Sequence, residues 1–164
     1  MLRLLFVCTG NICRSPTAEA VTRALFERAA MVGRFELESA GLGGWHLGDP
    51  PDPRAIRRAA LRSYDLTGQR ARQIAPQDYR DFDLLLAIDR GHLRAMRRAC
   101  PPDHAEKIKL FMAFAEGAEA GDVPDPYYGE SADFDLVLDL VEGGAHALVA
   151  ALSHSGAGGA GPAR

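Results

Sequence analysis

Short apolar runs are separated by longer amphipathic stretches along most of the chain. Residues 2–7 form a nearly continuous apolar run before a glycine-containing loop, which is typical of a strand buried on both faces. Residues 83–88 repeat this pattern, and residues 35–40 alternate apolar and polar positions as a strand does. Residues 107–112 give a weaker signal of the same kind. The pattern therefore predicts four strands.

Helical periodicity fills the intervals between these runs. Ser15 followed by Pro16 is typical of an N-cap with proline at the first helical position, and apolar residues then recur at helical spacing as far as Val32. Similar signals predict three further helices, over about residues 52–64, 91–99 and 134–148.

The order of these elements predicts a single α/β domain. Strands that alternate with helices form a parallel sheet covered by helices on both faces, and 164 residues suit one such domain. We assign the domain to residues 1–152 and predict that residues 153–164, rich in glycine and alanine, form a disordered tail. Ligands of such sheets bind beyond the carboxyl ends of the strands, where the loop after the first strand lies.

That loop, residues 8–15 and called the Cys8 loop below, has the form of a phosphate-binding loop. A short loop that enters a helix can turn successive backbone N–H groups inward, and the positive end of the helix dipole adds to their field. Gly10 and Asn11 tolerate the backbone angles that this requires. The predicted phosphate-binding residues are Thr9, Gly10, Asn11, Ile12, Cys13, Arg14 and Ser15.

Cys8 is the predicted nucleophile. The inward N–H groups, the helix dipole and Arg14 all favour its thiolate form, and Ser15 can donate its hydroxyl to the sulfur. The planar guanidinium of Arg14 can grip two phosphoryl oxygens and neutralise charge in the transition state. A buried cysteine that merely closes a strand is the plain alternative, and the full loop context argues against it.

Residues 116–130 have the composition of a functional loop and carry the predicted general acid, Asp125. A phosphocysteine route needs a proton for the leaving oxygen, and a carboxylic acid facing the Cys8 loop can supply it. Asp89, at the end of the third strand, is the alternative acid. Tyr127 and Tyr128 can wall a cleft for a flat ring, although a turn aspartate beside packed tyrosines gives the same local sequence.

Composition narrows the class of partner. Hydrophobic residues make up 47% of the chain and charged residues 25%, and a formal net charge of −3 gives no broad basic field for nucleic acid. Uninterrupted apolar runs are short, so we expect no membrane insertion, no signal peptide and a cytoplasmic protein. Three cysteines, two of them in one loop, suit a reducing compartment. The histidines lack metal-site spacing, so we expect no metal and no cofactor.

These motifs together resemble the low-molecular-weight protein tyrosine phosphatases over about residues 2–152. The resemblance implies a flavodoxin-like, doubly wound α/β domain whose four-stranded parallel sheet has the order 2-1-3-4. It also implies hydrolysis of protein phosphotyrosine and small aryl phosphates through a phosphocysteine intermediate, with a phosphotyrosyl protein as partner. It rests on residues 8–16, Ser39-Ala40-Gly41, Pro53-Arg54-Ala55, Ala71-Arg72-Gln73 and Asp125-Pro126-Tyr127-Tyr128.

The resemblance implies a role for each site residue. Cys8 is expected to be the nucleophile, Arg14 the phosphate clamp, and Asp125 the general acid and then the base. The residues expected to hold the shape of the site are Asn11, Ser15, Ser39 and Asp89. Those expected to line the substrate cleft are Ile12, Trp45, Tyr127 and Tyr128.

Two positions depart from the family pattern. His92 stands where the family usually has asparagine, and Gln69 stands where many members have histidine. We therefore expect the hydrogen bonds behind the loop to be wired differently, with an effect on turnover rather than on the reaction.

Three rival activities stay open. Arsenate reductases of the same fold relay a disulfide through two further cysteines near the third strand, where this chain has only Cys100. Phosphoarginine phosphatases place a threonine where this chain has Ile12, whose apolar bulk favours an aryl ring. A non-catalytic phosphate-binding module is the third rival, and the joint presence of Cys8, Arg14 and Asp125 disfavours it.

Two further expectations concern regulation and assembly. Cys8 and Cys13 lie five residues apart on one tight loop, so we expect them to form a disulfide that protects the nucleophile from oxidation. We also expect a monomer or weak self-association.

Overall fold

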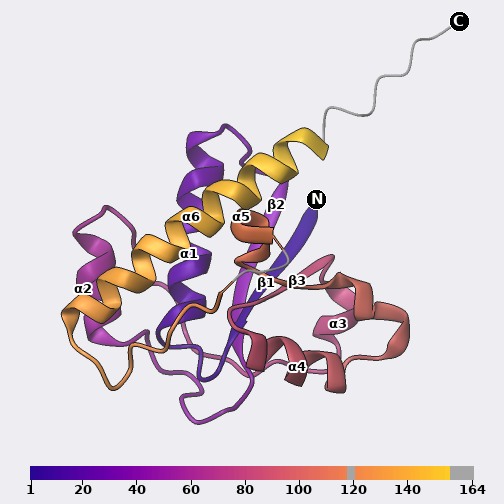
Figure 1. The fold of residues 1–164 in the computed structure, drawn as a ribbon, viewed down its shortest axis with the longest axis horizontal. Helices are drawn as coiled ribbons and strands as arrows, with labels where there is room; N and C mark the ends of the chain where they lie inside the picture. The colour runs from indigo at the N-terminus through magenta and orange to yellow at the C-terminus, as the bar shows by residue number, and fades with distance from the viewer. Residues whose placement is uncertain (118–120, 156–164) are drawn as a thin grey trace, which may run out of the picture.

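A computed structural model describes residues 1–117 and 121–155 of the chain (Figure 1). At its centre lies a four-stranded parallel sheet in the order β2-β1-β3-β4, which confirms the predicted fold class and strand order. The strands are β1 (Leu2–Cys8), β2 (Phe35–Gly41), β3 (Leu84–Ala87) and β4 (Ile108–Leu110). The helices are α1 (Arg14–Arg28), α2 (Pro53–Ala60), α3 (Asp78–Asp81), α4 (Arg90–Ala99), the 3₁₀ helix η1 (Pro102–Lys107), α5 (Ala113–Glu116) and α6 (Ser131–Ser155).

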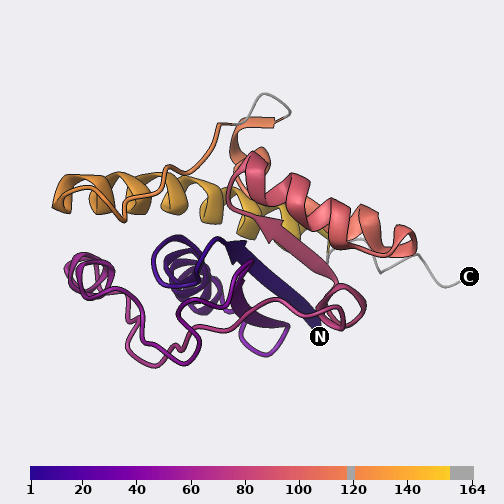
Figure 2. The same cartoon turned by 90° about the horizontal axis from the view of Figure 1, so that it is seen from below.

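Helices cover both faces of the sheet because successive side chains of a strand point to opposite sides. Leu4 and Phe6 of β1 join a core cluster with residues of α1 and α6, whereas Leu5 joins a second cluster with residues of α3 and α4. Figure 2 shows the strands between α1 on one side and α3 on the other. Cys8 pairs with Gly41, so β1 and β2 end together at the edge that carries the Cys8 loop.

Two helices are shorter than predicted. α1 ends at Arg28, and Val32 lies beyond it and is exposed. The chain leaves the helix through Ala30, whose φ of 55° is left-handed and incompatible with a continuing α-helix. α2 likewise ends at Ala60, in a turn that contains Ser63 with a φ of 66°.

α6 is the long helix that crosses the molecule beside α1 in Figure 1. Its length and composition would allow it to cross a membrane, but its apolar side is buried against α1, α2 and α5. Gly144 allows a close approach there, because a Cβ at this position would lie 2.7 Å from the Phe111 ring. A core role therefore accounts for the apolar character of α6.

The end of α6 revises the predicted domain boundary. Ser153, His154 and Ser155 were expected in the tail but form the last residues of the helix. These residues extend a helix whose buried apolar residues, from Phe134 to Leu148, already hold it against the domain. The rest of the predicted tail, residues 156–164, lies outside the described residues.

Candidate active site

The Cys8 loop joins the end of β1 to the first turn of α1. α1 begins at Arg14 with Cys13 at the N-cap, so the prediction that Ser15 caps the helix is wrong. No side chain caps this helix end, because the hydroxyl of Ser15 is directed to Cys8 instead. In the described part of the chain, no group accepts a hydrogen bond from the backbone N–H groups of residues 10–15. These N–H groups are available to an anion at the helix N-terminus.

Asn11 fixes the shape of the loop. Its φ is 60°, a left-handed conformation that asparagine adopts more readily than most residues. Its Nδ2 donates to Ser15 Oγ and to Ser39 Oγ, each at 2.9 Å, and its Oδ1 accepts from the backbone N–H of Arg72 at 3.0 Å. Gly41, at the end of β2, approaches the Cys8 loop so closely that a Cβ at this position would lie 2.9 Å from the carbonyl oxygen of Thr9. A larger residue would therefore displace the loop.

Cys8 lies at the floor of the loop and is 2% exposed. Its Sγ is 2.9 Å from Ser15 Oγ. Ser15 Oγ accepts a hydrogen bond from Asn11, and its own proton has two possible acceptors, the sulfur at 2.9 Å and the carbonyl of Ala40 at 3.4 Å. Donation to the closer sulfur stabilises a thiolate. Cys13 differs, since burial, with the nearby charge of Asp52 as a smaller cause, raises the pKa of its thiol. Cys13 therefore stays protonated at neutral pH while Cys8 has a partner for its charge.

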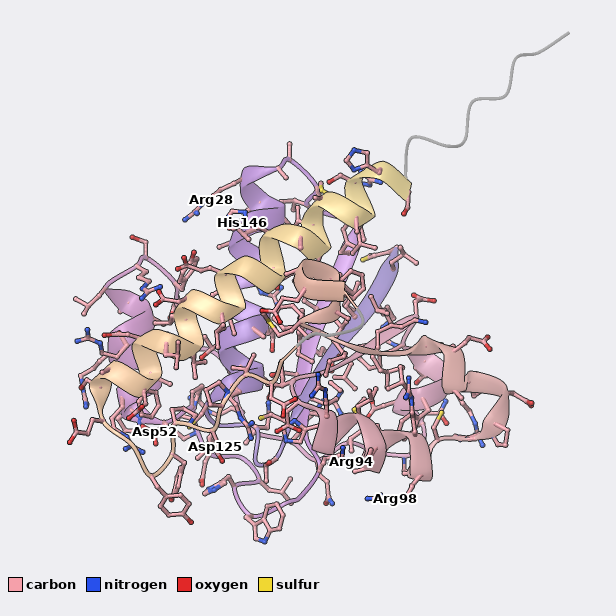
Figure 3. All side chains as sticks on the ribbon, in the orientation of Figure 1. Arg28, Asp52, Arg94, Arg98, Asp125 and His146 are labelled. Atoms are coloured by element: carbon pink, nitrogen blue, oxygen red, sulfur yellow. The ribbon has the colours of Figure 1, made fainter. Side chains whose placement is uncertain are left out.

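Arg14 lies beside the nucleophile between two carboxylates. It is buried, and its Nη1 donates to Asp89 Oδ2 at 2.9 Å and to the carbonyl of Val123 at 3.1 Å. Its Nη2 donates to Thr9 Oγ1 at 3.3 Å and lies 3.6 Å from Asp125 Oδ2. Figure 3 shows Asp125 on the loop that leads into α6. The structure thus brings the predicted clamp and both candidate acids to one place.

Cys8, Arg14 and Asp125 line one cleft of about 370 Å³. Trp45 and Tyr128 stand on its rim and are 72% and 95% exposed. A larger hollow of about 700 Å³ lies between α4, α5 and β4, but no predicted site residue lines it. The cleft is lined by Cys8, Thr9, Gly10, Ile12, Cys13, Arg14, Trp45, His46, Asp125, Tyr127 and Tyr128. The smaller cavity therefore holds the predicted nucleophile, clamp and acid.

Arg54 supports the loop that carries Asp125, and sequence reasoning did not single it out. Its guanidinium donates to the carbonyl of Tyr127 at 2.8 Å and to that of Gly129 at 3.3 Å. Asp52, the N-cap of α2, holds Arg54 in turn through Oδ2 at 2.9 Å. Asp125 Oδ1 accepts from the backbone N–H of Tyr127 at 3.1 Å, which closes the turn. In the sequence, the signal for this role was Asp52, an N-cap aspartate placed two residues before Arg54.

The two departures from the family pattern both lie behind the Cys8 loop. Gln69 accepts from Ser39 Oγ at 3.3 Å and donates to the carbonyl of Pro16 at 2.9 Å, so it extends the Asn11 network to α1. His92 is buried, and its Nε2 is 2.9 Å from Thr9 Oγ1. His92 therefore contacts a residue that lines the cleft, whereas Gln69 supports the loop through Ser39 and the start of α1.

No cluster of three or more histidine, cysteine or carboxylate side chains forms a metal site within residues 1–117 and 121–155. His46, the histidine that lines the cleft, has Asp49 as its acidic neighbour at 3.6 Å.

Comparison with known proteins gives one consistent result. The family described as low molecular weight phosphotyrosine protein phosphatase matches residues 3–157. A low molecular weight protein-tyrosine-phosphatase of Streptomyces coelicolor is 45% identical over 153 residues, which cover 92% of this chain and 93% of the relative. The crystal structure of YfkJ from Bacillus subtilis has a TM-score of 0.88 and 36% identity, over 94% of this chain and 96% of that one. A protein tyrosine phosphatase from Entamoeba histolytica, crystallised with Hepes in the active site, has a TM-score of 0.90 and 31% identity, over 95% and 99% of the two chains.

Proposed function

This chain belongs to the low molecular weight phosphotyrosine protein phosphatases, a family of hydrolases, and we propose that it removes phosphate from protein tyrosine through a phosphocysteine at Cys8. One observation carries the proposal: Cys8, Arg14 and Asp125 line a single cleft, and nothing within residues 1–117 and 121–155 accepts a hydrogen bond from the backbone N–H groups of residues 10–15. A nucleophile, an anion clamp and a proton donor are the three groups that the reaction requires.

In the first step the phosphoryl group binds the N–H groups of the Cys8 loop and the guanidinium of Arg14. The Cys8 thiolate attacks phosphorus, and the bond from phosphorus to the phenolic oxygen breaks. Asp125 donates a proton to that oxygen, so tyrosine leaves neutral. Arg14 Nη2 carries two N–H groups, so one can bind a phosphoryl oxygen while the other donates to Thr9 Oγ1 at 3.3 Å and Nη1 stays on Asp89 at 2.9 Å.

In the second step water hydrolyses the phosphocysteine. Asp125, now a carboxylate, takes a proton from the attacking water, and the bond from phosphorus to sulfur breaks. Ser15, 2.9 Å from Cys8 Sγ, stabilises the departing thiolate by donating its hydroxyl. Phosphate then leaves and the starting protonation states are restored.

The rivals fit the structure less well. Cys100 packs with Leu5 and Met96 in the core cluster on the α3 and α4 side of the sheet, whereas Cys8 belongs to the other cluster. A disulfide relay from Cys8 to Cys100 would therefore have to cross the sheet. Ile12 lines the cleft with an apolar side chain, which favours an aryl ring over a phosphoguanidinium.

The test compares wild type with Cys8→Ser in nitrophenyl phosphate hydrolysis with a chelator present. The variant should fall to background, because a serine hydroxyl is a poor nucleophile and a poor leaving group, yet it should still bind vanadate through the loop and Arg14. Rapid acid quench of wild type should trap a phosphorylated Cys8, seen by mass spectrometry. Hydrolysis by Cys8→Ser above background, or a wild type that needs metal, contradicts the covalent mechanism.

Cys13 is proposed as the redox partner of Cys8. Peroxide converts the Cys8 thiolate to a sulfenic acid, and attack by the Cys13 sulfur forms a disulfide and releases water. All three cysteines are free thiols here, and Cys8 and Cys13 line the same cleft. Peroxide inactivation should be reversible by dithiothreitol in wild type and largely irreversible in Cys13→Ser. Sulfinic acid at Cys8 in the wild type, with no disulfide, would show that Cys13 does not protect it.

We further infer a cytoplasmic location and a monomer or weakly associating protein. The apolar face of α6 is buried within the domain, and the free cysteines suit a reducing compartment. Sedimentation velocity across a hundredfold range of concentration tests the assembly, and a constant dimer would overturn it.

A further inference from the structure

Thr9 lies on the wall of the cleft with its hydroxyl oxygen between two nitrogen atoms. Arg14 Nη2 is 3.3 Å from Thr9 Oγ1, and His92 Nε2 is 2.9 Å from the same oxygen. Arg14 is always a donor, so Thr9 accepts from it. The direction of the bond with His92 depends on which ring nitrogen carries the proton.

The other side of the His92 ring settles that question. The backbone N–H of Asp89 donates to His92 Nδ1 at 3.2 Å, so Nδ1 accepts. Asp89 Oδ1 lies equally close to Nδ1, at 3.2 Å, but it accepts from the backbone N–H of His92 at 2.7 Å. Burial is the main reason that the pKa of His92 falls to about 4, and the ring is therefore neutral at physiological pH. A neutral ring that accepts at Nδ1 carries its proton on Nε2, which donates to Thr9.

Thr9 Oγ1 consequently accepts two hydrogen bonds, and both of its lone pairs are occupied. Its own proton must be donated elsewhere. Across residues 1–117 and 121–155 no acceptor lies within hydrogen-bonding distance of that hydroxyl, and Thr9 is an exposed residue that lines the cleft.

We propose that His92 is a positioning residue that, together with Arg14, fixes the Thr9 hydroxyl as an O–H donor to an oxygen of the phosphoryl group in the cleft. Thr9 supplies the contact and His92 acts through it. The proposal rests on the proposed function, because the acceptor is the phosphoryl group that Cys8 attacks. It adds a side-chain donor to the backbone N–H groups of the Cys8 loop.

His92 also has a purely structural task, from which this role must be separated. Its backbone N–H donates to Asp89 Oδ1 at 2.7 Å, and its ring closes a capping box at the start of α4. Two substitutions divide the tasks. His92→Asn keeps an acceptor near the position of Nδ1 but is too short to reach Thr9, whereas His92→Gln can place an N–H near the position of Nε2.

The experiment is a double-mutant cycle on nitrophenyl phosphate hydrolysis, with kcat and KM measured separately and vanadate affinity as a second readout. Thr9→Val should lower kcat/KM about 10- to 100-fold, as expected for a lost hydrogen bond to a charged group, and Thr9→Ser, which restores the hydroxyl, should recover most of that loss. His92→Asn should lose part of the same activity, and His92→Gln should recover it. In a Thr9→Val background, His92→Asn should cost nothing further.

Full additivity of the two substitutions would overturn the proposal, as would a Thr9→Val variant with wild-type kcat/KM and vanadate affinity. A His92→Asn variant that loses thermal stability without losing activity would assign the residue to the capping box alone. Each variant should still form a phosphocysteine in acid quench. Its absence from wild type would instead contradict the proposed function, so the two failures are distinguishable.

Discussion

Asp89 and Asp125 both bring a carboxylate to Arg14, but they come from different kinds of structure. Asp89 follows β3 and caps α4, and its side chain is 20% exposed. One of its oxygens binds Arg14 at 2.9 Å, and the other accepts from the backbone N–H of His92 at 2.7 Å. Asp125 lies on a loop, is 49% exposed, and approaches Arg14 only to 3.6 Å.

The hydrogen bonds of the two carboxylates indicate which of them can exchange a proton. Both oxygens of Asp89 are engaged by donors in a fixed geometry, so protonation of Asp89 would break bonds that orient Arg14 and cap α4. Asp125 Oδ1 closes a turn with Tyr127, while Oδ2 faces the cleft without a bond shorter than 3.6 Å. Asp89 is therefore suited to orient the clamp, and Asp125 to transfer protons.

The largest effect is expected from Asp125→Ala. A phenolate leaving group needs a proton in the transition state, so the rate of Cys8 phosphorylation by a phosphotyrosyl peptide should fall by about 10²–10⁴. The defect should shrink with aryl phosphates whose phenols are more acidic, because these leave without help. Single-turnover rates across such a series measure this dependence.

Asp89→Asn is the matched control for that series. It should show a smaller defect with little dependence on the leaving group, because Arg14 is misplaced but the acid remains. If the leaving-group dependence appeared in Asp89→Asn and not in Asp125→Ala, the assignment of the two carboxylates would have to be exchanged.

Arg14→Lys removes the partner that both carboxylates share. Lysine keeps the charge, but its single ammonium cannot bind Asp89 and two phosphoryl oxygens at once as the planar guanidinium can. We therefore expect kcat/KM to fall by about 10²–10³. Vanadate affinity, measured by inhibition, should fall in parallel. Near-wild-type turnover would mean that Arg14 serves the fold alone.

The smallest effect concerns His92, which lies beside Asp89 and has no counterpart beside Asp125. Its pKa of about 4 in the folded protein is below the ordinary value of 6.5, because burial disfavours the charged ring. Between about pH 4 and 6.5 the unfolded chain binds more protons, so stability should rise with pH across this window, by on the order of 3 kcal/mol, and then level off.

Urea unfolding at a series of pH values tests this, with the difference between wild type and His92→Gln isolating the contribution of His92. The exposed His146, labelled in Figure 3, provides the matched control substitution His146→Gln outside the site. An identical profile for wild type and His92→Gln would contradict a buried neutral ring.

The sequence predicted the sheet well because buried parallel strands are short apolar runs that stand out locally. The sequence also located the Cys8 loop, because the anion-binding form of a short loop between a strand and a helix depends on residues that are adjacent in sequence. It was wrong about Ser15, because the choice between capping α1 and binding Cys8 depends on Asn11, which holds the hydroxyl from outside the helix. The prediction that α1 reaches Val32 was wrong for a related reason, because hydrophobic periodicity does not reveal the left-handed backbone angle at Ala30.

Residue identity by itself therefore determined the order of the elements, the loop that can hold an anion, and the short set of side chains able to attack, clamp and protonate. Three features became visible only in the folded molecule. Asp89 and Asp125 both approach Arg14, and Arg54 binds the loop that carries Asp125. His92 and Arg14 both contact the Thr9 hydroxyl. The physical reason is that the direction of a hydrogen bond depends on every neighbour that competes for the same atom. Those neighbours can be far apart in sequence, as Arg14 and Val123 are at 109 residues, and only the folded chain brings them together.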